Sequence, residues 1–283
     1  MKRIAHFVLG LDEDASEELL IDHKRALQSM ESAAEEIPAG WELRQFVTIV
    51  DRAIKYSSAF LPVRLATDAK SLDNARLPRL PRAQEVFNAL ATEEAQLVVL
   101  TNADICLSAD FYKSVISRFE NGVTSFSINR RTIDAPIPKD VDPIHWGRMQ
   151  PGRKHPGSDC FVSTPLVCQR MILGDTYFGL PGIGNLVLLN LALNDGSFTR
   201  FREDFLTFHF GDLRPWKADS RHNFRVTNER RLADVVVELR RKNGNQKFQE
   251  ALSRSEISPK FPGLADSFTH KFRARRLLGA LLR

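Results

Sequence analysis

The chain has 283 residues, 43% of them hydrophobic and 27% charged, which is enough for one large globular domain with a substantial core. No stretch approaches the roughly 20 consecutive apolar residues that a membrane-spanning helix needs. His6 interrupts the short apolar run at the start and acidic residues follow it, which argues against a secretory signal peptide. The three cysteines lack CxxC spacing, so we expect neither a disulfide framework nor a structural zinc site, and a reducing cytoplasm fits best.

The net charge of +5 is unevenly distributed along the chain. Residues 216–283 hold 16 Lys and Arg against 7 Asp and Glu, whereas residues 1–215 hold 24 against 28. We therefore predict a domain over 1–215 and a basic helical extension over 216–283. The end, 271–283, combines apolar and basic side chains as an amphipathic helix on an anionic membrane does, although packing onto a neighbouring domain or a solvated basic surface explains it equally well.

The first half of the chain alternates strand-like and helix-like segments, which is typical of a mostly parallel sheet covered by helices. Ser16 and Ser108 are suitable N-caps for two of the helices. The apolar run 97–100 (LVVL) predicts a central strand that is buried on both faces. The predicted strands are 4–9, 43–50, 62–66, 97–100 and 123–128, and the predicted helices are 16–34, 82–91 and 109–119.

The second half has weaker patterns. Residues 132–157 contain five prolines and three glycines and predict a surface loop, where contacts with substrate tend to lie. The run 184–194 is apolar on most faces and predicts a buried helix. Short strands are predicted at 159–163, 198–201 and 205–210, and the clearest helices of the extension at 232–241 and 271–283.

The loop Thr101-Asn102-Ala103-Asp104 follows the predicted central strand directly. In open α/β sheets ligands bind beyond the carboxyl ends of the strands, so Asn102 and Asp104 are the first polar residues to consider. Spaced two apart, both side chains can face one hard divalent ion, and Mg²⁺ is usually held by one or two carboxylates together with substrate phosphates. A turn that closes the strand before the next helix is the alternative.

Residues 97–111 (LVVLTNADICLSADF) resemble the strand and acidic loop of the GT-A class of nucleotide-sugar glycosyltransferases, in a bacterial group similar to glycosyltransferase family 2. Four further segments follow in the order typical of that group: 126–131 (FSINRR), 155–162 (HPGSDCFV), 179–185 (GLPGIGN) and 208–212 (FHFGD). The resemblance covers about residues 4–215. It implies a GT-A (Rossmann-like) α/β fold with a mostly parallel sheet flanked by helices.

The resemblance also implies a metal site. Asp104 matches the final metal-binding acid of the family, while Asn102 stands where many relatives have Asp. His209 resembles the histidine that some GT-A enzymes bring to the metal from the far end of the domain. A core histidine bonded to backbone is the alternative for His209.

The family pattern leaves the base of the reaction open. Inverting GT-A enzymes carry an acid at the start of a helix after a glycine-containing loop, and this chain has Asn185 there, which cannot accept a proton. Three options stay open: Asp159 is the general base, the reaction is retaining and needs no protein base, or the chain binds without catalysing. A turn carboxylate bonded to backbone is the alternative for Asp159.

Arginines near the predicted strand ends are candidates for phosphate binding, because Arg offers a fork of donors. Arg130 and Arg131 follow a predicted strand directly. Arg79 and Arg82, near the start of the helix before the acidic loop, are weaker candidates. Solvated surface arginines are the alternative in each case.

We therefore expect a glycosyltransferase that depends on Mn²⁺ or Mg²⁺, takes a nucleoside diphosphate sugar as donor and a glycan or other hydroxyl compound as acceptor, and serves cell-surface glycan or polysaccharide synthesis. A cytoplasmic protein with peripheral contact to the inner face of the membrane through 271–283, and no nucleic-acid partner, fits these features. The alternative is a non-catalytic GT-A-like module that binds a sugar nucleotide or glycan. The sequence contains no P-loop, HExxH or GxSxG motif.

Overall fold

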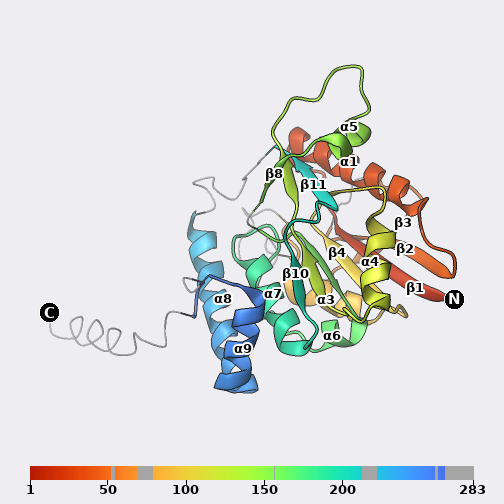
Figure 1. Cartoon of the computed structure of the whole chain (residues 1–283). Coiled ribbons are helices and arrows are strands. Elements are labelled where there is room, and N and C mark those ends of the chain that lie inside the picture. Colours follow the sequence, from red (N-terminus) through yellow and green to blue (C-terminus); the bar gives the residue numbers. More distant parts are fainter. Residues whose placement is uncertain (52–54, 69–78, 156, 212–221, 259–260, 265–283) are drawn as a thin grey trace.

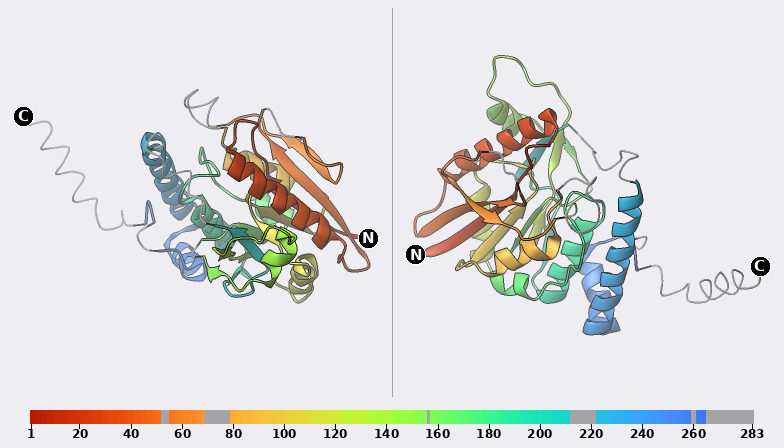
Figure 2. Two further views of the ribbon diagram at one scale, coloured as in Figure 1. Left: turned by 90° about the horizontal axis from the view of Figure 1, so that it is seen from above. Right: turned by 180° about the vertical axis from the view of Figure 1, so that it is seen from behind.

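The structure is a computed structural model that describes residues 1–51, 55–68, 79–155, 157–211, 222–258 and 261–264. The chain folds around two β-sheets, and helices cover both faces of the larger one (Figure 1; Figure 2). Within the described residues, no helix combines the length and the apolarity needed to cross a membrane.

The larger sheet has seven strands in the order β10-β6-β9-β4-β1-β2-β3. Neighbouring strands are parallel except at β9, which runs antiparallel to both β4 and β6. The strands are β1 (Lys2–Leu9), β2 (Trp41–Ile49), β3 (Phe60–Arg64), β4 (Leu97–Thr101), β6 (Phe126–Ile128), β9 (Cys160–Ser163) and β10 (Thr199–Phe201). Every residue of β4 is buried, which confirms the central strand predicted from its apolar run.

The side chains of each strand alternate between two hydrophobic cores, because successive residues of a strand point to opposite faces. In β1, Ala5 and Phe7 join the core beneath α3 (Ala83–Ala91), α6 (Pro165–Gln169) and α7 (Ile183–Asn194). Ile4 and Val8 join the core beneath α1 (Glu17–Ala34) and α4 (Phe111–Glu120). Full burial of one large apolar side chain stabilises the fold by about 1.5–3 kcal/mol. The helices are α1 (Glu17–Ala34), α3 (Ala83–Ala91), α4 (Phe111–Glu120), α5 (Pro143–Met149), α6 (Pro165–Gln169), α7 (Ile183–Asn194), α8 (His222–Asn243) and α9 (Asn245–Ser255).

The smaller sheet is built in part from the segments that follow strands β4 and β6 of the larger sheet. Its order is β5-β11-β7-β8, and its strands are β5 (Cys106–Leu107), β7 (Arg131–Ile133), β8 (Arg153–Lys154) and β11 (Thr207–Phe210). Strand β11 runs antiparallel to β5 and parallel to β7, with Phe208 opposite Cys106 on one side and Arg131 on the other. Because β5 follows β4 and β7 follows β6 along the chain, β11 lies beside the segments that leave both strands.

Most of the predicted elements are confirmed, with two corrections. The hydroxyl of Ser16 caps α1 by accepting a hydrogen bond from Leu19 N. Ser108 does not cap α4, because that helix begins after Asp110 and the Ser108 hydroxyl donates to the Asp110 carboxylate. The predicted loop over 132–157 was wrong in part: it contains α5, β8 and most of β7. Proline at the start of α5 is compatible with a helix, since the first turn has no backbone bond for it to lose.

Helices α8 and α9 share a core with the sheet. Leu232 and Val236 of α8 and Phe248 and Ala251 of α9 belong to the same cluster as α7. Helix α9 is absent from the predicted elements because only three of its residues are buried, too few for a clear apolar pattern. The predicted boundary at 215 and the predicted helix over 271–283 lie outside the described residues.

Candidate functional site

The loop after β4 is held in place from two sides of the molecule. His23, a fully buried residue of α1, donates from Nδ1 to Ala103 O at 2.6 Å. On the other side, Asn102 N donates to Asp159 O at 3.1 Å, because β9 runs antiparallel to β4 and pairs Cys160 with Thr101. The loop therefore presents Asn102 and Asp104 at the carboxyl end of the central strand, where ligands bind in open α/β sheets.

The smaller sheet brings His209 to Asp104. Strand β11 lies next to β5, which begins two residues after Asp104, and His209 Nε2 lies 3.0 Å from Asp104 Oδ2. The histidine is 1% exposed and the carboxylate 20%. Burial alone would raise the pKa of Asp104, but the charge and contact of His209 and the charge of Arg130 together lower this pKa to about 2. The carboxylate is therefore ionised over the physiological pH range.

The orientation of the His209 ring suits a metal ligand. Burial opposes the charged ring, but the charge of Asp104 prevails and raises the pKa of His209 above its ordinary value. The other ring nitrogen, Nδ1, donates to Gly211 O at 2.8 Å, which is how metal-binding histidines are usually oriented. With Nδ1 protonated, Nε2 is the atom that a cation would meet beside Asp104 Oδ2.

These two side chains fit a divalent ion whose other ligands come from phosphate and water. In the described part of the chain, no group of three or more His, Cys, Asp or Glu residues is arranged to hold a metal ion. Mg²⁺ sites in phosphate-handling enzymes commonly use one or two carboxylates plus substrate phosphates, so a two-residue set is sufficient there. The side chain of Asn102 is bonded to Asp159 and not to this pair: its Nδ2 donates to Asp159 Oδ1 at 2.7 Å.

Asp159 and Arg130 form the second half of the cluster. Arg130 follows β6, which pairs with β9, and its Nη1 lies 3.3 Å from Asp159 Oδ2. Its Nη2 lies 3.2 Å from His155 Nε2. The charge of Arg130 also acts on the pKa of both Asp104 and His209, so the guanidinium is electrostatically coupled to that pair. The structure thus brings Asn102, Asp104, Arg130, Asp159 and His209 together.

Arg131 is directed elsewhere. Its guanidinium donates to the backbone carbonyls of Phe205, Gly147 and Arg148 at 2.9 to 3.1 Å, and it lies over the ring of Phe208. These bonds fix β11 and α5 to β7. The expectation that Arg131 grips phosphate is therefore not supported by its contacts, because its Nη1 and Nη2 donors bond to the chain's own backbone.

The weaker phosphate candidates also have acidic partners. Arg79 forms ion pairs with Asp12, Asp51 and Asp68, which follow β1, β2 and β3, at 2.7 to 3.3 Å. Arg82 pairs with an acidic residue that precedes α7, Asp175. Both arginines therefore contribute to holding the loops at the sheet's carboxyl edge.

The start of α7 lies against the segment that carries Asp159. A Cβ atom on Gly184 would come within 3.0 Å of Ser158 O, so glycine allows this close approach. Gly182, the N-cap residue, has a φ of 92°, a conformation that favours glycine. Asn185 belongs to this first turn of α7, which begins at Ile183, and provides an amide rather than a carboxylate.

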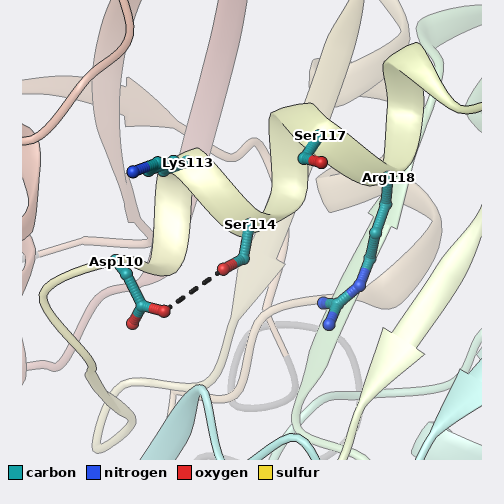
Figure 3. A pocket seen from close by; sticks show the side chains of 5 residues that line it. All are labelled: Asp110, Lys113, Ser114, Ser117 and Arg118. Carbon is teal, nitrogen blue, oxygen red and sulfur yellow. Dashed lines mark hydrogen bonds between the residues drawn. The ribbon is translucent and has the colours of Figure 1, made fainter.

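A shallow depression of about 330 Å³ lies on α4, apart from this cluster. The residues that line it come from α4 and its N-cap: Asp110, Lys113, Ser114, Ser117 and Arg118. The Ser114 hydroxyl contacts the Asp110 carboxylate (Figure 3). None of its lining residues belongs to the cluster around Asp104. It contains no paired acid and histidine of the kind seen at β4.

Three residues of the cluster region were missing from the predicted site. His155 lies inside a motif that the sequence does show, 155–162, but no role was evident for it. Asp22 and His23 are buried on α1, and the charges of His209 and Asp104 both act on the pKa of Asp22. Their helical spacing from Leu19 and Met30 places polar residues on an apolar helix face, which is a signal for a buried polar contact.

No protein-family model matches the chain. No curated protein matches it either. Among solved structures, residues 1–349 of TarS from S. aureus in complex with UDP-GlcNAc give a TM-score of 0.54 at 12% identity, over 92% of this chain and 74% of that one. A second structure of that TarS region gives 0.53 at 13% identity, over 96% and 75%.

A third similar structure is PcManGT, a mannosyltransferase from Pyrobaculum calidifontis, in complex with GDP-Man and Mn²⁺. Its TM-score is 0.50 at 13% identity, over 99% of this chain and 80% of that one. Such low identities carry an argument about fold alone. The seven-stranded sheet, its flanking helices and these neighbours agree that the chain has the GT-A-like glycosyltransferase fold.

Proposed function

We propose that the chain is a metal-dependent glycosyltransferase that uses a nucleoside diphosphate sugar as donor. The observation that carries the proposal is the pairing of Asp104 with the buried His209 at the carboxyl edge of the sheet, with Arg130 and Asp159 beside it. A carboxylate and an imidazole oriented for a cation, next to a guanidinium, are the groups that a metal-bound diphosphate requires.

Asp104 and His209 would hold the divalent ion, Mn²⁺ or Mg²⁺. When bound, such an ion acts as a Lewis acid that offsets the charge developing on a departing nucleoside diphosphate. Arg130 lies close enough for its charge to act on the pKa of both Asp104 and His209. It would therefore bind the same diphosphate through its N–H donors. Preorganised charges of this kind account for much of the acceleration in many enzymes.

Asp159 is the carboxylate of this cluster that is neither paired with His209 nor at the proposed metal site. In the proposed reaction an acceptor hydroxyl oxygen forms a bond to the anomeric carbon. The bond from that carbon to the diphosphate oxygen breaks, and its electron pair leaves with the diphosphate. The hydroxyl proton passes to Asp159, whose Oδ2 is buried and lacks a hydrogen-bond partner among the described residues.

A retaining reaction without a protein base and a non-catalytic binding module stay open as rivals. Asn102 and Asn185, both amides where the family carries acids, favour the module. The cell-surface glycan as product, a bacterial source and a cytoplasmic place at the membrane through 271–283 belong to the same proposal. They rest on the family resemblance and on the basic composition of the tail.

Calorimetric titration with UDP-GlcNAc and GDP-mannose, with and without Mn²⁺, followed by an assay for donor hydrolysis, tests the proposal. We expect metal-dependent binding of one donor and slow hydrolysis of it. Binding without any turnover across a panel of hydroxyl acceptors would favour the module instead. Absence of binding for every sugar nucleotide tried would contradict the proposed function.

A further inference from the structure

Besides His209 Nε2, which faces Asp104 Oδ2, two atoms of the candidate site are buried and lack hydrogen-bond partners among the described residues. They are Arg130 Nε and Asp159 Oδ2, on side chains that are only 9% and 16% exposed. Most buried polar groups in native proteins are hydrogen-bonded, so each exception needs a physical reason. Here both exceptions belong to a single ion pair.

The ion pair itself is loose. Arg130 Nη1 lies 3.3 Å from Asp159 Oδ2, whereas charge-assisted hydrogen bonds between Arg and carboxylate measure roughly 2.7–2.9 Å. The distance allows attraction between the charges, but no well-formed hydrogen bond satisfies Oδ2. A buried pair with this geometry regains little of the cost of desolvating its charges. A better acceptor can therefore displace the carboxylate from Arg130.

His155 is also poorly matched to Arg130. Its Nδ1 lies 3.1 Å from Gly157 N and its Nε2 3.2 Å from Arg130 Nη2, and both of these neighbours are N–H donors. A neutral imidazole accepts at one nitrogen and donates at the other, so it can satisfy only one of the two. If Nη2 moved away, Nδ1 could accept from Gly157 while Nε2 donated to a bound oxygen.

We propose that Arg130 couples donor binding to acceptor activation by exchanging Asp159 for a diphosphate oxygen when the donor binds. In the free protein the guanidinium neutralises Asp159 and keeps it from an acceptor hydroxyl. With donor bound, the guanidinium turns to the more highly charged diphosphate, and Asp159 and His155 become available to the hydroxyl. The inference rests on the proposed function, and it predicts that the base is exposed only when a donor is present.

A double-mutant cycle on nucleotide affinity tests the exchange. UDP and GDP, each with Mn²⁺, are titrated calorimetrically into the unmodified chain, Asp159→Asn, Arg130→Gln and the double variant. If Asp159 competes with the diphosphate for Arg130, Asp159→Asn tightens binding by about fivefold, the worth of an ion pair of about 1 kcal/mol. In the Arg130→Gln background the same substitution changes affinity by less than about twofold, since only a distant negative charge is removed.

A matched control and a second reference variant complete the design. Asp134 forms an ion pair with Arg153 outside the cluster, and Asp134→Asn should leave nucleotide affinity unchanged. If Arg130→Gln does not fold, Arg130→Met replaces it, because methionine keeps a long unbranched side chain but removes the charge and the donors that bind Asp159 and the diphosphate.

Equal effects of Asp159→Asn in the two backgrounds, or weaker binding in the single variant, would overturn the exchange and leave the proposed function intact. Failure of the unmodified chain to bind either nucleotide with Mn²⁺ would contradict the proposed function, and this inference with it. Thermal melting of every variant separates loss of folding from loss of binding.

Discussion

Two buried polar clusters adjoin strand β4, and they differ in how completely their hydrogen bonds are formed. The first, at His6 of β1, is saturated: His6 Nδ1 lies 2.7 Å from Tyr112 OH, His6 Nε2 lies 3.0 Å from Thr101 Oγ1, and Gln45 Nε2 donates to Tyr112 OH at 3.2 Å. The second, beyond the end of β4, contains the loose pair of Arg130 and Asp159.

The difference separates a structural network from a binding site. The saturated network joins β1, β2, β4 and α4 and leaves none of its buried side-chain atoms without a partner. The cluster at the sheet's edge keeps atoms without partners, although burial makes such atoms costly. Unfilled hydrogen-bonding capacity, rather than burial or charge alone, is thus what distinguishes the candidate site from the cluster at His6. Substitutions in the two clusters should then have opposite consequences for binding and for stability.

The largest expected effect is loss of ligand binding in Asp104→Asn. The substitution removes the charge that attracts a cation, so metal-dependent nucleotide binding should fall by about 10- to 150-fold, since interactions of charged groups are worth about 1.5–3 kcal/mol each. Calorimetry with Mn²⁺ and UDP or GDP measures the change. The melting temperature should change little in comparison. Unaltered nucleotide affinity in this variant would contradict the proposed role of Asp104 as a metal ligand.

A substitution in the saturated cluster should do the reverse. Tyr112→Phe removes a hydroxyl that serves both His6 and Gln45 and leaves both without that partner. The free energy of unfolding should fall by about 1–3 kcal/mol, the usual cost of a buried polar group left unpaired. Urea denaturation measures this loss, and nucleotide affinity should stay within about twofold. Weaker nucleotide binding in the folded variant would show that the two clusters are not separate.

Acid should weaken the saturated cluster through His6. Burial lowers the pKa of His6 from its ordinary 6.5 to about 3. The unfolded chain therefore binds a proton at this residue below pH 6.5, while the folded chain does so only near pH 3. The unfolded state binds more protons in this window. The free energy of unfolding therefore decreases as the pH is lowered, by on the order of 1 kcal/mol per pH unit at most.

Comparison with variants isolates this contribution. His23 also has a lowered pKa and His209 a raised one, so both alter the total pH dependence. The unfolding free energy of His6→Asn, measured at pH 7, 6 and 5, should decline less steeply than that of the unmodified chain. His145, an exposed residue of α5, provides the control His145→Asn. If the unfolding free energies of His6→Asn and of the unmodified chain declined equally steeply with decreasing pH, the interpretation of His6 as a neutral buried histidine would be contradicted.

Local patterns were enough to predict much of the fold. The run LVVL predicted a strand buried on both faces, and β4 is one, because an uninterrupted apolar segment of that length has no polar face to expose. The placement of Asn102 and Asp104 at a strand end followed from the same pattern. The GT-A fold itself came from the succession of motifs, and the similar solved structures agree with it.

Long-range pairing was beyond local patterns. Asp104 and His209 are more than a hundred residues apart, and they meet because β11 inserts between β5 and β7. Strand β5 has only two residues and β7 only three, so neither shows a recognisable alternation. For the same reason Arg130 and Arg131 looked equivalent in sequence. Neighbouring residues leave a strand in opposite directions, and only the packing shows which guanidinium reaches the site.

The smallest expected effect is at the depression on α4. Lys113 lines that surface together with Ser114 and Arg118, but no residue of the Asp104 cluster reaches it (Figure 3). Lys113→Ala should change stability by no more than about 0.5 kcal/mol, as for most surface substitutions, and leave nucleotide affinity unaltered. Calorimetry and urea denaturation of this one variant measure both. These results would show that the depression on α4 takes no part in nucleotide binding, unlike the cluster around Asp104. A loss of affinity in Lys113→Ala would instead extend the donor-binding surface to α4.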